Sequence, residues 1–300
     1  MKLYAPHYYK DFRCIADHCR HSCCIGWEID VDEDSLAFYE GLEGEYAPAI
    51  RASIEGEDTP HFALAAHDRC PHLDERGLCR IISAYGEDAL CDICREHPRF
   101  YHDTPHGKEV GLGLACEAAC SLILFSDDFD RMVEIEELPG TPDADAFDAT
   151  ALRARVYEIL KDATLSYDAR LAKLAKEFGV STSICSDNAW CELLADLEYL
   201  DEQHLGLFML YGADADVLPE QEAWLCRALA YFVYRHCSAA MDAEDFAASL
   251  GLALFLERLL ASLIAAGHDA LDSARIISEE LEYSEDNTNT IRSVFFEVKS

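Results

Sequence analysis

The sequence predicts a mainly α protein in two parts, a cysteine-rich first part with short β elements and a helical second part. Ten of the fourteen cysteines lie between Cys14 and Cys120. Beyond residue 149 the apolar residues recur at helical spacing. Between the two parts, the acidic run 134–148 contains proline and glycine, which interrupt regular structure. We therefore expect a cysteine-rich, metal-organised region over 1–133, a connection over 134–148 and a helical region over 149–300.

The charge balance limits the partners. The chain has 58 acidic and 24 basic side chains, which gives a formal net charge of -34. Nucleic acid requires a basic face that displaces counterions, and an anionic membrane surface makes a similar demand. We therefore expect neither nucleic acid nor a membrane as a partner, and expect most carboxylates to solvate the surface.

The compartment decides how the cysteines are interpreted. The first residues, MKLYAPHYY, contain no apolar run and no cleavage site, so no secretory signal is predicted and the chain is expected to be cytoplasmic. In that reducing compartment, clustered cysteines more often bind a metal or act in catalysis than form disulfides. A chain of 300 residues, half of them hydrophobic, also buries a core without disulfides.

The first part opens with CIADHCRHSCC (residues 14–24), which places four cysteines within eleven positions. The side chains of adjacent residues are expected to diverge, so only one of Cys23 and Cys24 should bind a given metal. In the next segment Trp27, Ile29 and Val31 alternate with acidic residues as in a short strand, and a helix is predicted over 34–41.

Four further thiols follow at Cys70, Cys79, Cys91 and Cys94. The last two form a CxxC pair, a common way for one turn of chain to direct two sulfurs at one metal. A thioredoxin-type redox pair is the alternative, but it needs a preceding strand and a βαβ context that the sequence does not show.

The spacing does not identify the metal. Four thiolates suit zinc or an iron–sulfur cluster equally. Ten thiols exceed the needs of one four-ligand site. We therefore expect either two sites or several cysteines that bind no metal.

The second part reads as successive amphipathic helices. One covers 152–160, a second covers 171–178 and ends at Gly179, and a third begins at Pro219 with Arg235 and His236 near its negative end. The core candidates of the third helix are Leu225, Leu229, Phe232 and Val233.

The most hydrophobic segment runs from Leu250 to Ala266. Glu257 and Arg258 lie at its centre and it is short for a bilayer span, so a buried helix is predicted, capped by Asp242 and ended by Gly267. Cys226 and Cys237 have no partner at ligand spacing, and they are predicted to be core residues.

Three blocks of the sequence carry a resemblance to a known family. They read CIADHCRHSCCIGWEIDVDEDSLAFY (14–39), CPHLDERGLCRIISAYGEDALCDICREHPRFY (70–101) and GLGLACEAACSLIL (111–124). In this order and spacing they resemble the flagellin lysine-N-methylase family, related to a wider group of cysteine-rich zinc- or iron-chelating proteins. The resemblance implies methyl transfer from S-adenosylmethionine to a lysine of a protein, with a cysteine-bound metal centre. That centre is expected to be an iron–sulfur cluster of the 4Fe-4S type, or zinc.

The resemblance also implies a ligand set. The matching cysteines are Cys14, Cys19, Cys23, Cys24, Cys70, Cys79, Cys91, Cys94 and Cys116, together with Trp27, Pro98 and Arg99. Cys120 stands where the family does not call for cysteine and ranks last as a ligand. The block LACEAAC also lacks the proline that often follows the cysteine matching Cys116.

Motifs do not locate the cofactor site. The only Gly-rich hit, GLG at 111–113, is expected to mark a turn or bulge, and the CxxxCxxC pattern of radical chemistry is absent. Methyl transfer requires a neutral amine, and aromatic faces stabilise the cationic methyl donor. The candidates for cofactor binding are Trp27 and Phe100, and those for catalysis are Tyr101, Glu96, Asp103 and Arg99, with His102 as a further aromatic face.

The sequence is compatible with three functions. The first is a metal-dependent protein-lysine methylase, whose partner is a lysine-bearing protein, with flagellin as one candidate. The second is a metal-binding module without catalysis. The third is an electron-transfer or redox-sensing protein with an iron–sulfur cluster. The sequence leaves the oligomeric state open.

Overall fold

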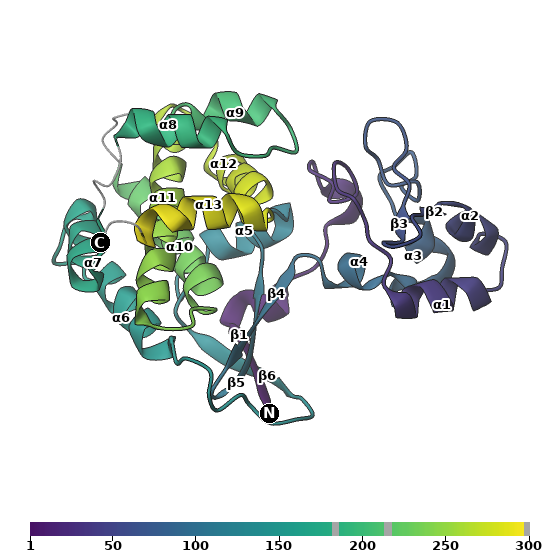
Figure 1. Ribbon diagram of the computed structural model, residues 1–300, viewed down its shortest axis with the longest axis horizontal. Coiled ribbons are helices and arrows are strands. Elements are labelled where there is room, and N and C mark those ends of the chain that lie inside the picture. Colours follow the sequence, from purple (N-terminus) through teal and green to yellow (C-terminus); the bar gives the residue numbers. More distant parts are fainter. Residues whose placement is uncertain (182–185, 213–217, 297–300) are drawn as a thin grey trace. The chain divides into compact units, whose positions relative to one another are not determined.

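The computed structural model describes residues 1–181, 186–212 and 218–296 (Figure 1). The chain divides into two compact units, which we name the helical unit (Met1–Phe12 and Arg99–Ser300) and the cysteine-rich unit (Arg13–Pro98). These boundaries lie elsewhere than the predicted connection over 134–148, whose first residues belong to strand β6 (Met132–Glu137). The predicted mainly α character with short β elements is confirmed.

A four-stranded sheet lies in the helical unit. It consists of β1 (Lys2–Pro6), β4 (Arg99–Thr104), β5 (Gly107–Leu112) and β6, in the order β4-β5-β1-β6. β4 and β5 form an antiparallel hairpin, β1 runs parallel to β5, and β6 pairs antiparallel with β1.

The GLG run at 111–113 leaves the sheet for the predicted turn at Gly113, where Cys116 N donates to Gly113 O at 3.4 Å, whereas Gly111 still lies inside β5. It stands opposite Phe100 in the β4–β5 hairpin, and a Cβ atom at Gly111 would meet the Phe100 ring at 2.2 Å. Glycine therefore leaves room for an aromatic ring that covers the strand.

Helices fill the rest of the helical unit. Their bounds are α5 Glu117–Leu124, α6 Thr150–Leu160, α7 Tyr167–Phe178, α8 Asp187–Ala195, α9 Gln203–Phe208, α10 Pro219–Phe232, α11 Ala243–Ala265, α12 Ala270–Ile277 and α13 Glu285–Phe296. Two π-helical segments, Val233–Cys237 and Ser278–Glu282, continue α10 and α12. The predicted helices are confirmed, and Gly179 ends α7 in the left-handed conformation (φ 69°).

Helix α11 is the core of the helical unit, and it packs against α7, α10, α12 and α13. It is long and apolar enough to cross a membrane, but 89% of its most apolar window is buried in the protein. The Asp242 side chain accepts hydrogen bonds from two backbone amides at its start, and Gly267 follows its end (φ 92°), as predicted. The four core candidates of α10 are buried, and so are Cys226 and Cys237.

The cysteine-rich unit has shorter elements. Their bounds are α1 Glu33–Gly41, α2 Ala47–Ala52, β2 Ile54–Glu55, β3 His61–Phe62, α3 Arg80–Tyr85 and α4 Asp92–Glu96. The predicted helix over 34–41 is therefore confirmed as α1.

The strand predicted around Ile29 and Val31 does not form a regular ladder. Both residues are buried, as their alternation with acidic residues indicates. The segment pairs with β3 through a single antiparallel bridge between Asp30 and His61, in which Val31 N donates to Pro60 O and Phe62 N donates to Ile29 O. Its partner β3 is two residues long, which is too short to build a longer strand pair.

Candidate metal centre

Five thiols gather in the core of the cysteine-rich unit, and we name them the thiol cluster: Cys24, Cys70, Cys79, Cys91 and Cys94. Cys70 and Cys91 are buried, and the other three are half-buried. Burial raises the pKa of Cys70 to about 12, and negative charge on the neighbouring thiols Cys24, Cys79 and Cys91 raises it as well. The sulfurs thus lie near enough to one another to interact electrostatically.

The CxxC pair of the thiol cluster opens helix α4. Cys91 immediately precedes the first helical residue, and Cys94 follows within the first turn. A hydrogen bond between the two thiols lowers the pKa of Cys91 and raises that of Cys94, so Cys94 acts as the donor. The preceding strand that a thioredoxin-type pair needs is not found here, because a 3-10 turn (Glu87–Ala89) precedes α4.

Backbone pairing brings the other thiols of the cluster together. Cys70 N donates to Cys24 O at 2.8 Å, which joins the opening cysteine block to the second one. Cys79 forms an antiparallel bridge with Leu73 and directly precedes α3. Segments that are far apart in the sequence therefore supply one core.

Cys23 and Cys24 converge, contrary to the predicted divergence. Cys23 is exposed and Cys24 is half-buried. A hydrogen bond with the Cys23 thiol nevertheless lowers the pKa of Cys24 to about 7. That only one of the two binds a given metal stays a prediction.

The chemistry of the thiol cluster suits a thiophilic metal. Sulfur donors select zinc and iron–sulfur clusters over hard cations such as Mg²⁺. Among the described residues, however, no three His, Cys, Asp or Glu side chains stand as ligands around a single ion. The thiols share one core, but they do not form the arrangement of a metal-binding site. Metal binding therefore stays a prediction.

The other predicted ligands make different contacts. The Cys14 sulfur and the Cys19 thiol hydrogen-bond with backbone groups two residues further along the chain. Cys116 lies in the helical unit, immediately before α5. Cys120 is buried in the same unit and donates to Leu271 O at 3.6 Å, as expected for a core thiol.

The two faces of strand β4 separate the candidates for catalysis from those for cofactor binding. Tyr101 and Asp103 are exposed, and both contact Lys108: its Nζ lies 5.8 Å from the Tyr101 ring centroid and 3.6 Å from the Asp103 carboxylate. Phe100 and His102 point to the opposite face, into the helical unit. Tyr101 and Asp103 therefore lie together beside Lys108 on the exposed face, and Phe100 lies on the other face.

Arg99 is engaged at the start of β4. Its Nε donates to the Tyr9 hydroxyl at 2.9 Å, and its guanidinium lies 5.6 Å from the Phe12 ring centroid. Glu96 is the last residue of α4, and Trp27 is half-buried in the same cysteine-rich unit. The roles proposed for these side chains stay predictions.

A buried ionic group in the helical unit was not predicted as a site. The Arg235 guanidinium lies between the rings of Phe100 and Tyr283, 4.9 and 4.8 Å from their centroids. Its Nε is 3.4 Å from the Glu282 carboxylate, which also hydrogen-bonds with His236 Nε2 at 2.7 Å. Arg235 and His236, predicted to complement a helix dipole, instead pair with a buried carboxylate.

Both partners of this ionic group come from π-helical segments. Arg235 and His236 lie in Val233–Cys237, and Glu282 ends Ser278–Glu282. Such turns are rare in proteins, and those that occur often lie at functional sites. The available sequence signal was a run of polar residues, Tyr234 to His236, inside an otherwise apolar helix.

His102 adjoins the buried ionic group. Burial lowers the pKa of His102 to about 3, and the positive charges of Arg153 and Arg235 lower it too, so the ring is neutral. Within the described residues, its Nε2 and the Tyr234 hydroxyl have no hydrogen-bond partner. Arg153 itself pairs with Glu109 through two hydrogen bonds of 2.7 Å.

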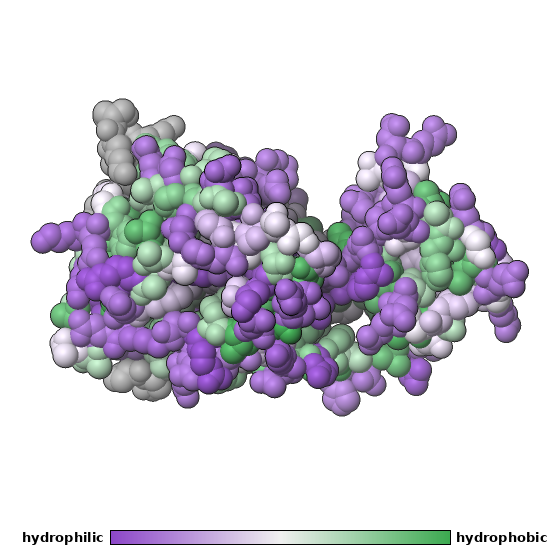
Figure 2. All heavy atoms as spheres, turned by 90° about the horizontal axis from the view of Figure 1, so that it is seen from below, coloured by the Kyte–Doolittle hydropathy of each residue, from purple (hydrophilic) through white to green (hydrophobic). Residues whose placement is uncertain are grey.

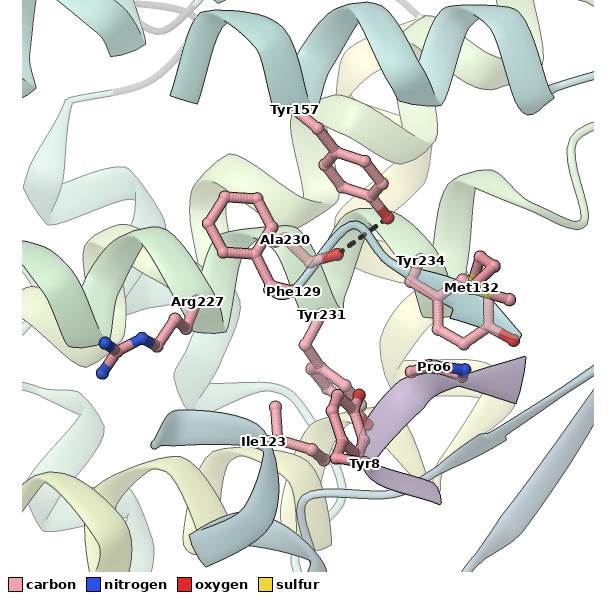
Figure 3. A pocket seen from close by; sticks show the side chains of 10 residues that line it. All are labelled: Pro6, Tyr8, Ile123, Phe129, Met132, Tyr157, Arg227, Ala230, Tyr231 and Tyr234. Atoms are coloured by element: carbon pink, nitrogen blue, oxygen red, sulfur yellow. Dashed lines mark hydrogen bonds between the residues drawn. The ribbon is translucent and has the colours of Figure 1, made fainter. Parts of the chain in front are cut away.

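Aromatic rings line a small cavity nearby (Figure 3). Tyr8, Phe129, Tyr157, Tyr231 and Tyr234 contribute to its wall. Its volume of about 10 Å³ is room for roughly one water molecule. A nucleoside cofactor does not fit this cavity as it stands.

Much of the visible surface is hydrophilic, in keeping with the acidic composition (Figure 2). Some carboxylates pair with basic side chains, such as Glu177 with Arg155, but the chain has 58 acidic residues against only 24 Lys and Arg. The protein therefore attracts cationic partners more than anionic ones.

The comparisons with known proteins agree with the resemblance that the sequence carries. A mainly α chain with a cluster of cysteine thiols is similar to curated proteins whose names denote lysine N-methylation. No protein-family model matches the chain, and no solved structure matches it.

Three relatives define the similarity. The lysine-N-methylase of Salmonella choleraesuis is 30% identical over 133 residues, and that of Salmonella typhimurium is 29% identical over 130 residues. Each match covers 41% of this chain and 32% of the relative, so the chain spans about a third of their length. The flagellar biosynthetic protein FliU of Salmonella muenchen is 28% identical over 130 residues, which cover 41% of this chain and 77% of that protein.

Proposed function

We propose that this protein transfers a methyl group from S-adenosylmethionine to a lysine side chain of another protein. The observation that carries the proposal is the similarity to two proteins named lysine-N-methylase. The name of the third relative, a flagellar biosynthetic protein, supports flagellin as the first substrate to test. The net charge of -34 complements a lysine-bearing target. The proposed place of action is the cytoplasm, where thiols stay reduced.

The reaction sets clear demands on the protein. The lysine nitrogen attacks the methyl carbon as the carbon–sulfur bond of the sulfonium breaks, and the nitrogen loses one proton to a base or to water. The amine must therefore be neutral at the moment of attack, which desolvation or a nearby base achieves. No electron is exchanged, so the step needs no redox metal.

The thiol cluster has a separate role in this proposal. Its sulfurs would hold an iron–sulfur cluster of the 4Fe-4S type, or zinc, and the bound metal would cross-link segments that are distant in the sequence. We propose that four of the five thiols Cys24, Cys70, Cys79, Cys91 and Cys94 act as its ligands, because all five share one core. Cys14, Cys19, Cys23 and Cys116 remain further candidates.

The test measures methyl incorporation. Protein purified without oxygen is incubated with S-[methyl-³H]adenosylmethionine and flagellin, and labelled lysine is identified by mass spectrometry. The C91S variant should lose metal and activity together, whereas C226S, which changes a buried thiol of the helical unit, should keep both. Absence of incorporation by metal-replete protein, with flagellin and with other flagellar proteins, contradicts the proposal.

A metal-binding module without catalysis is the second candidate. The thiol cluster favours it, because it brings five sulfur donors into one core. Metal analysis with a visible absorption spectrum separates iron–sulfur from zinc. Calorimetry with S-adenosylmethionine then separates the candidates, since a module without catalysis binds the metal but not the cofactor. A cluster that is reduced reversibly, without cofactor affinity, would indicate electron transfer or redox sensing.

A further inference from the structure

Asp32 connects two helices of the cysteine-rich unit. Its Oδ1 accepts a hydrogen bond from Ser35 N at 2.9 Å and caps the start of α1. Its Oδ2 accepts a hydrogen bond from Asp92 N at 2.8 Å, across 60 residues of sequence. One carboxylate thus satisfies backbone amides at the N-termini of α1 and α4.

The amide of Asp92 belongs to the backbone of the CxxC pair. Asp92 directly follows Cys91, which stands at the capping position of α4 but makes no capping hydrogen bond with its own side chain. Asp32 bonds with the first amide of α4, while the Cys91 sulfur contacts the thiol and the backbone of Cys94 in the thiol cluster.

A second side chain of α1 holds the residues that precede the pair. Tyr39 is fully buried, and its hydroxyl donates to Ala89 O at 2.8 Å. Asp32 and Tyr39 therefore fix the segment 89–92 at two points, both from the same helix.

From these contacts we infer that Asp32 is a positioning residue of the thiol cluster, which sets the turn between the Cys91 and Cys94 sulfurs, with Tyr39 as the second anchor. The hydrogen bonds to Asp92 N and Ala89 O fix this turn whether or not a metal is bound. The consequence of the turn for a metal rests on the proposed function. Residues that orient metal ligands in this way contribute about 10- to 100-fold to metal affinity.

Two substitutions separate the cap of α1 from the contact with α4. Asparagine caps a helix as well as aspartate does, but the amide group of D32N presents a donor where Asp92 N needs an acceptor. The hydroxyl of D32S also caps α1, but it is too short to bridge to Asp92. The D34N variant removes a carboxylate from the same first turn of α1 and serves as the charge control.

The first readout needs no metal. In metal-free protein, the rate of iodoacetamide labelling at Cys91 and Cys94 is measured by mass spectrometry, with buried Cys70 as the internal reference. We expect a several-fold rise at both positions in D32N and D32S, a smaller rise in Y39F and no change in D34N. An equal rise at Cys70 would indicate general unfolding and would overturn the inference. Unchanged labelling in both Asp32 variants would overturn it too.

The second readout is zinc affinity, measured by competition with a chromophoric chelator. We expect D32N and D32S to bind zinc about 10- to 100-fold more weakly than the original protein, and D34N to bind it equally well. Weakening confined to D32N would reflect a clash of two donors, and equal weakening in D34N would reflect net charge. Either result overturns the positioning role. If the original protein binds no zinc or iron, the proposed metal centre fails, whereas the labelling rates still decide the role of Asp32.

Discussion

The carboxyl group of Glu257 should make the stability of the helical unit depend on pH. Glu257 lies on α11, 2% exposed, and accepts a hydrogen bond from the Tyr167 hydroxyl. Burial raises the pKa of Glu257 to about 7, although this hydrogen bond and Arg258 act in the opposite direction. The side chain thus keeps its proton in the folded protein at a pH where the unfolded chain has already lost it.

The sign and the size of the effect follow from this difference. The folded state binds the proton more tightly, so the free energy of unfolding is highest below pH 4.5 and falls as the pH rises to about 7, where it levels off. The pKa difference is 7 minus 4.5, and at about 1.4 kcal/mol per pH unit it amounts to roughly 3 kcal/mol.

The assay is urea unfolding between pH 4.5 and 8, with E257Q as the comparison. A W27F background leaves Trp190 and Trp224 as the fluorescent residues, both in the helical unit, and Trp190 packs against Phe255 of α11 (centroids 4.6 Å apart). The stability of the original protein should fall relative to that of E257Q by about 3 kcal/mol across this range. Y167F should extend the fall to higher pH, because it removes a bond that favours the charged form. Parallel pH profiles for the original protein and E257Q would refute the argument.

Three further outcomes are expected from urea unfolding. The E109Q variant leaves the buried Arg153 guanidinium without its carboxylate and should cost about 3–5 kcal/mol; a loss below about 1 kcal/mol would show that the charge reaches water. The D242A variant removes the cap of α11 and should lower the free energy of unfolding by about 1 kcal/mol; unchanged stability would show that water replaces the Asp242 carboxylate at the two backbone amides. The G111A variant drives a methyl group against the Phe100 ring and should cost about 1–3 kcal/mol, whereas unchanged stability would mean that the ring moves aside freely.

Local signals predicted much of the helical unit. Gly179, Gly267 and Asp242 mark helix ends through their own conformation or side chain, so nearby sequence suffices to predict them. The division into units depends instead on pairing between β1 and β5, which are about a hundred residues apart in the sequence. No local sequence pattern indicates this pairing. Because cysteines continue up to Cys120, the sequence also showed no sign of the unit boundary at Arg99.

The candidate site was predictable to a similar degree. The gathering of Cys70, Cys79, Cys91 and Cys94 followed from their spacing, and of the predicted ligands in the opening block the structure places Cys24 in the same core. The candidates around Phe100 were chosen by nearness in sequence, but successive residues of a strand point to opposite faces. The group around Arg235 was missed because its partner, Glu282, lies 47 residues further along the chain.

The two π-helical segments restrict how this protein can change in length. A π-helical turn holds one residue more than an α-helical turn, so a deletion within Val233–Cys237 could be absorbed as regular helix. The residues on either side of the segment would keep their places around the helix axis, but Arg235 or His236 would be lost or shifted away from Glu282. A single-residue deletion here would therefore preserve the helix but break the buried ion pairs with Glu282. We expect insertions and deletions to be tolerated in the loops and not in this segment.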